Sequence, residues 1–137
     1  MEPHFALTDL EFEKQFETCS LNPELFTHEA HLRLAWIHIK KYGEWTAIEN
    51  VCTQLTHYVE FLGVGQKYNH TLSVAAVKAV THFMKRSAAA NFQEFITEFP
   101  RLKYNFRDLI KAHYKIDIFN TEKARQVYIE PDLLPFE

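Results

Sequence analysis

Two histidines three residues apart, His28 and His31, are the side chains whose types and spacing point most directly to chemistry. On a helix, positions i and i+3 lie on one face, so both imidazole rings can reach a common point. A third ligand would come from another helix, with His113 as the first candidate and His70 as the next. Three imidazoles and an open coordination position suit Zn²⁺, and they also suit copper or ferrous iron. The four histidines therefore predict a divalent transition-metal site.

The same histidines could act without a metal as general acid and base, because imidazole titrates near neutral pH. Tyr68, Lys67 and Tyr114 would then polarise or orient a bound carbonyl or carboxylate, with Tyr68 counted among the catalytic residues. A third interpretation is structural, with each inward histidine donating to a backbone carbonyl or to a neighbour such as Asn69. The residues alone leave these three alternatives open.

Two polar residues, Asn69 and Ser73, fall on the apolar face of a predicted helix, where apolar residues are expected. A buried polar group without a partner costs about 1–3 kcal/mol, so these two must bind something. We expect them either to contact a substrate or to serve the fold, with Asn69 as an N-cap. The direction of the neighbouring His70 is undecided by periodicity.

Helical phase separates the remaining histidines. His57 and His82 fall among charged and polar residues, so we expect them on the surface, and we expect His4 in a mobile terminus. The inward-facing histidines predicted by phase are His28, His31, His38 and His113. Glu29 is expected to point away from the face of His28 and His31. No inward stripe contains a clear acidic residue, which disfavours a di-iron carboxylate site.

The helix predicted over residues 28–42 must position the first two histidines. Thr27 can cap it and Gly43 can end it, and apolar residues cover most of its circumference. A helix that is apolar nearly all round lies inside a bundle. We therefore predict a buried central helix.

The pattern of residues in the rest of the chain predicts further helices joined by short loops. Thr8 with Glu11 is a capping-box pattern, and Asn120 is expected to cap the last helix. With only 3 Gly and 5 Pro, the chain has few residues for tight β-turns. We predict an all-α fold of five to seven helices in one domain, residues 1–137, with an extended tail at about 129–137 that packs back on the bundle. The helices besides 28–42 are expected at about 8–19, 45–62, 72–87, 91–99, 105–114 and 120–128.

Composition excludes several functions. The formal charge of −3 and the lack of a Lys/Arg block disfavour a nucleic-acid partner. No apolar run approaches the roughly 20 residues of a membrane span, so we expect no membrane partner. Cys19 and Cys52 form no metal-type pair, and we interpret them as free thiols of a cytoplasmic protein.

Several separated motifs together resemble a family of small bacterial proteins of unknown function. They are Phe26-x-His28-x-x-His31-Leu32-Arg33-Leu34-Ala35-Trp36, Lys67-Tyr68-x-x-Thr71, His113-Tyr114 and Glu130-Pro131-Asp132-Leu133-Leu134-Pro135. The resemblance spans nearly the whole chain. It implies a helical protein whose motif residues, including Thr71, belong to one site, and it brings no activity. Members often have Lys-Tyr-His-Glu-Thr at 67–71, a pattern from which this chain departs at Asn69 and His70.

The leading hypothesis is an enzyme that acts on a small polar metabolite in a His-lined interior pocket. The substrate would be bound by Lys67, Asn69, Thr71, Ser73 and Tyr114. The alternative is a non-catalytic interaction protein with structural histidines, whose partner binds the tail near Leu133–Phe136 or an exposed aromatic surface. Neither the substrate nor the oligomeric state follows from the sequence.

Overall fold

The computed structural model describes residues 1–136, and every regular element within them is a helix. The all-α prediction is confirmed. Eight α-helices occur in this range, five of them with seven residues or more, together with three short 3-10 turns. The α-helices are α1 (Asp9–Glu17), α2 (His28–Tyr42), α3 (Glu44–Phe61), α4 (His70–Met84), α5 (Phe92–Glu98), α6 (Arg101–Tyr104), α7 (Phe106–Lys111) and α8 (Glu122–Gln126). The 3-10 turns are η1 (Pro3–Ala6), η2 (Pro23–Leu25) and η3 (Gly65–Lys67).

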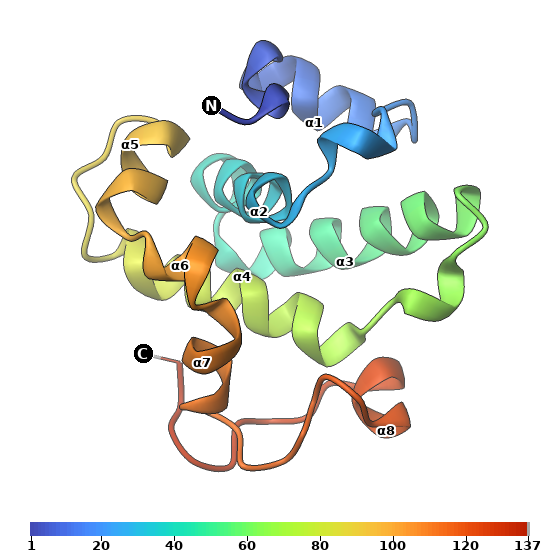
Figure 1. The fold of residues 1–137 in the computed structure, drawn as a ribbon, viewed down its shortest axis with the longest axis vertical. Coiled ribbons are helices and arrows are strands. Elements are labelled where there is room, and N and C mark those ends of the chain that lie inside the picture. Colours follow the sequence, from blue (N-terminus) through green and yellow to red (C-terminus); the bar gives the residue numbers. More distant parts are fainter. Residues whose placement is uncertain (137) are drawn as a thin grey trace. The chain divides into compact units, whose positions relative to one another are not determined.

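The chain forms two compact units, residues 1–68 and the residues from Asn69 onward. In the first unit α2 packs against both α1 and α3, and Figure 1 shows it between them. The Thr27 hydroxyl caps α2 by accepting from the Ala30 N–H, and Gly43 at φ 86° ends it. The predicted bounds of 28–42 are confirmed. Nine of its fifteen residues are buried, which explains its apolar circumference.

In the second unit α4 packs against α8. Asn69 caps α4 by accepting from the Leu72 N–H, so the N-cap interpretation of this residue is confirmed. A buried cluster joins α4 to the later segments through Ala75, Ile110, Tyr114, Ile118 and Ala124.

Two local predictions about helix ends are wrong. The helix expected at 105–114 is shorter, because α7 ends at Lys111, and a further short helix that was not expected, α6, precedes it. The last helix follows Thr121, not Asn120, because the Asn120 amide instead binds the Asp117 carboxylate in a turn. The capping box of Thr8 and Glu11 is present as predicted. Among the described residues no helix is both long and apolar enough to cross a membrane.

Candidate metal centre

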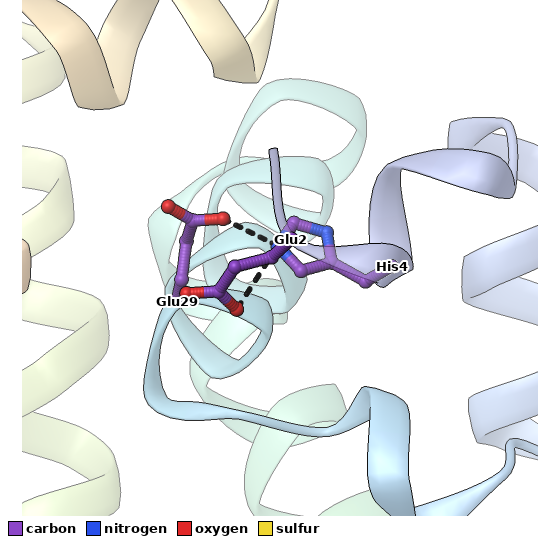
Figure 2. Close-up of side chains that lie close together, drawn as sticks. All are labelled: Glu2, His4 and Glu29. Carbon is purple, nitrogen blue, oxygen red and sulfur yellow. Dashed lines mark hydrogen bonds and ion pairs between the residues drawn. The ribbon is translucent and has the colours of Figure 1, made fainter.

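Three side chains of the first unit, Glu2, His4 and Glu29, bring one potential ligand atom each to a common point. The Nε2 atom of His4 lies 2.6 Å from Oε1 of Glu29 and 3.8 Å from Oε1 of Glu2. All three ligand atoms lie within 4.8 Å of one another. Figure 2 shows both carboxylates directed at the same nitrogen of the ring. This group could hold a metal ion.

The group is assembled by two segments that are 25 residues apart in the chain. Pro3 is the first residue of η1. Its ring fixes the backbone φ angle, which favours the tight turn that carries His4 inward. Glu29 lies in the first turn of α2. Thr27 links the two segments, since its hydroxyl donates to the Glu2 carboxylate and accepts from the Ala30 N–H. The His4 ring is fully buried and Glu29 is 5% exposed, whereas Glu2 is 25% exposed and forms the solvent side of the group.

Arg33, one helical turn after Glu29, holds the other side of His4. Its guanidinium donates to the His4 backbone oxygen at 2.7 Å and to the Leu7 oxygen at 2.8 Å. It also pairs with the Asp9 carboxylate at 2.9 Å. The same group lies 3.3 Å from Nδ1 of His4, and because arginine can only donate, Nδ1 must accept there. Nε2 therefore carries the ring proton and donates to Glu29.

Burial lowers the pKa of His4 below its ordinary value, and the neighbouring Arg33 charge acts in the same direction. The hydrogen bond to Glu29 opposes the shift without reversing it. The ring is therefore neutral at neutral pH. A neutral imidazole is the form that binds metals.

The 2.6 Å contact between His4 and Glu29 is a hydrogen-bond distance. In a tetrahedral zinc site, bonds of about 2.0–2.2 Å place neighbouring ligand atoms roughly 3.4 Å apart. Metal binding would therefore replace the shared proton and widen this contact by under about 1 Å. Nδ1 would then carry the ring proton and could no longer accept from Arg33. The 2.7 Å bond from Arg33 to the His4 backbone oxygen does not involve the ring.

Neither His28 nor His31 belongs to this group. His28 is the exposed first residue of α2, so the prediction that it faces inward is wrong. As the first residue of α2 it precedes the covered part of the helix, whereas the next residue, Glu29, is buried against His4. His31 is partly buried, and its Nε2 is fully buried with no hydrogen-bond partner among the described residues. Burial and the nearby His28 lower the pKa of His31 to about 4. His38 is buried, as predicted.

The other two predicted metal ligands lie in the second unit. His70 is the first residue of α4, partly buried, and burial lowers its pKa. His113 follows α7 and is partly exposed. Its Nδ1 lies 2.7 Å from the Leu134 backbone oxygen, and its ring stacks on Phe136 at 4.0 Å between centroids. The convergence of these histidines with His28 and His31 stays a prediction.

Most of the predicted substrate-binding residues make hydrogen bonds inside the second unit. Asn69 donates to the Ile118 oxygen and Ser73 to the Asn69 oxygen. Thr71 donates to the Val127 oxygen and accepts from the Ile129 N–H, and Tyr114 donates to the Ile129 oxygen. The bonds of Thr71 and Tyr114 anchor the chain after α8.

The fifth predicted substrate-binding residue, Lys67, and the predicted catalytic residue Tyr68 lie at the end of the first unit. Lys67 is exposed in η3, and Tyr68 bonds the buried Cys52 thiol. The substrate role of the five predicted residues and the catalytic role of Tyr68 stay predictions.

The residues that do converge were missed by the sequence reasoning. His4 was expected in a mobile terminus, and no inward acidic residue was expected; both predictions are wrong, because His4, Glu13 and Glu29 are buried. One sequence signal was available. Glu29 and Arg33 are opposite charges at i and i+4 on a helix otherwise covered by apolar residues, a pattern that requires buried partners.

No family model, curated protein or solved structure matches this chain. The family resemblance of the motifs therefore stays a prediction, and the chemistry of the site is argued from its geometry.

Proposed function

We propose that this protein binds a divalent transition-metal ion at Glu2, His4 and Glu29. The observation that carries the proposal is the convergence of two carboxylate oxygens and one imidazole nitrogen, from segments 25 residues apart, within 4.8 Å. Interior positions favour apolar residues, and a buried charged group destabilises the fold unless it is paired or ligates a metal. A metal site explains why this position holds three potential ligands.

The ligand types favour particular ions. Two carboxylates and a neutral imidazole carry a formal charge of −2, which a divalent cation neutralises. Nitrogen and oxygen ligands without sulfur suit Zn²⁺ or Fe²⁺ and disfavour Cu⁺. Three protein ligands leave a position for water or a substrate oxygen, as in catalytic zinc sites. Such an ion would polarise that oxygen or lower the pKa of bound water, consistent with an enzyme for a small polar metabolite.

Metal content of the purified protein tests the proposal. The tag must be C-terminal, because Glu2 and His4 lie close to the N-terminus, and it must be removable, because a polyhistidine tag would bind metal itself. After treatment with a chelator, the protein is titrated with Zn²⁺ or Fe²⁺, the latter without oxygen, against a competing chromophoric chelator. We expect one equivalent of bound ion, with affinity falling as the pH is lowered because ligand protons compete.

Matched variants locate the ion. His4→Gln and Glu29→Gln keep similar side-chain volume and remove a ligand, and each is expected to lower affinity by roughly 10-fold or more. His57→Gln, at an exposed position of α3, should bind like the unsubstituted protein. Stoichiometry well below one, or equal binding by all three variants, would refute the site.

His31 is the centre of a second candidate function, acid/base chemistry. The specific observation is its buried Nε2 without a hydrogen-bond partner among the described residues. A neutral imidazole with an available nitrogen can accept a proton from a bound molecule. Once a substrate is found, His31→Gln should abolish turnover while His57→Gln preserves it; full activity of His31→Gln would exclude this function.

A further inference from the structure

A cavity of about 360 Å³ lies within the second unit, and none of its lining residues belongs to the metal proposal. Its walls are mainly apolar and come from α4, α7 and the C-terminal tail, including Phe83, Leu109, Leu134 and Phe136. Pockets that bind small molecules span about 300–1,000 Å³ and are lined mostly by apolar groups with a few polar ones. This cavity has the size and lining of a site for a small ligand.

The tail wall of the cavity is held in place by His113. The backbone oxygen of His113 accepts from the Leu133 N–H at 3.0 Å, and its ring nitrogen Nδ1 bonds the Leu134 oxygen at 2.7 Å. Phe136 stacks on the same ring. The tail therefore forms a defined wall, although Leu133 and Leu134 are each more than half exposed.

The polar side chains of the lining are all basic. They are Arg101, His82 and His113, and no Asp or Glu occurs among the lining residues described. Arginine is always protonated and binds carboxylates through two parallel hydrogen bonds. The cavity thus combines an apolar interior with one permanent positive charge, which complements a ligand with an apolar body and one carboxylate.

We propose that this cavity binds a small amphiphilic monocarboxylate, with its hydrocarbon body among Phe83, Leu109 and Phe136 and its carboxylate at Arg101. The proposal does not depend on the metal centre. It assigns to the tail residues 134–136 the role of a binding wall rather than of a docking segment for another protein.

Titration of the full-length protein with octanoate, followed by amide chemical shifts in the presence of EDTA, tests the proposal. EDTA prevents the carboxylate from binding through a metal. We expect saturable shifts at Ala79, Leu109 and Ala112, which line the cavity. Octanamide has the same chain without the charge, and it should bind roughly ten-fold more weakly or worse.

Two variants separate charge from shape. Arg101→Gln should weaken octanoate roughly ten-fold and leave octanamide unchanged, whereas Ala112→Phe should weaken both ligands by filling space. Arg101 and Ala112 are exposed, so the fold should tolerate both changes, and Lys123→Gln at an exposed site of α8 is the charge control. Absence of saturable shifts, equal affinity for octanoate and octanamide, or unchanged octanoate binding in Arg101→Gln would overturn the proposal.

Discussion

Tyr114 stands in a motif that suggested substrate binding, yet its hydroxyl is used within the fold. The ring is buried, and the hydroxyl donates to the Ile129 backbone oxygen at 2.7 Å. Burial raises the pKa of Tyr114 above its ordinary value, with the neighbouring Tyr128 acting in the same direction. The phenol therefore stays protonated at neutral pH and is a hydrogen-bond donor that anchors the chain after α8.

Replacement of Tyr114 by Phe should lower the free energy of unfolding by about 1–3 kcal/mol, because it leaves the Ile129 oxygen without this donor. Urea denaturation measures the change. Tyr104→Phe is the matched control, since Tyr104 is 72% exposed and should lose almost nothing. A similar loss in both variants, or none in either, would show that the Tyr114 hydroxyl does not anchor the chain.

Among the elements, the junction between α2 and α3 depends on one backbone conformation. Gly43 is both the C-cap residue of α2 and the N-cap residue of α3, and it has φ 86° and ψ 166°. Residues with a Cβ rarely adopt this region. A Cβ at Gly43 would meet nothing within 4 Å, so only the backbone conformation opposes substitution here.

Gly43→Ala should therefore destabilise the protein by about 1 kcal/mol or more, measured by thermal or urea unfolding. Gly65→Ala is the comparison. Gly65 does not have a positive φ, and its added Cβ would lie 3.2 Å from Cγ of the flexible Glu60 side chain. Equal destabilisation by the two substitutions would mean that positive φ is not the cause.

Over the whole molecule, buried imidazoles link stability to pH. Burial is the largest cause of the lowered pKa values at four histidines of the described chain: His4, His31, His38 and His70. Each binds a proton more readily in the unfolded chain than in the folded one. Their stability contribution is therefore complete above the unfolded pKa of about 6.5 and is lost as the pH falls through the lower folded values.

His31, with its pKa lowered to about 4, should account for about 2 kcal/mol of the stability lost between about pH 7.5 and 5. His31→Gln removes the titrating group, so its free energy of unfolding should fall less steeply with acid, whatever its value at neutral pH. His57→Gln should retain the full dependence because His57 is exposed. Denaturant unfolding at several pH values checks this, and an unchanged slope in His31→Gln would contradict the assignment.

Local signals made the helical elements predictable. Thr8, Thr27, Asn69 and Gly43 act at helix ends as the sequence indicates, because a cap satisfies backbone groups within a few residues. The helical spacing of the apolar residues likewise predicted the bounds of α2 and its burial. The predictions failed where two local patterns competed, as at Asn120, whose amide binds Asp117 in a turn.

The sequence by itself determined the all-α class, the main helices and the burial of α2, because these depend on contacts between near neighbours along the chain. Only the tertiary structure decided which chemical groups meet. His4 and Glu29 are 25 residues apart, and helical phase cannot report a contact made by a non-periodic segment folding onto a helix. Helical phase also predicted that His28 faces inward, whereas its side chain is exposed. A side chain at the start of a helix can point to solvent while the same face of the helix is covered further along.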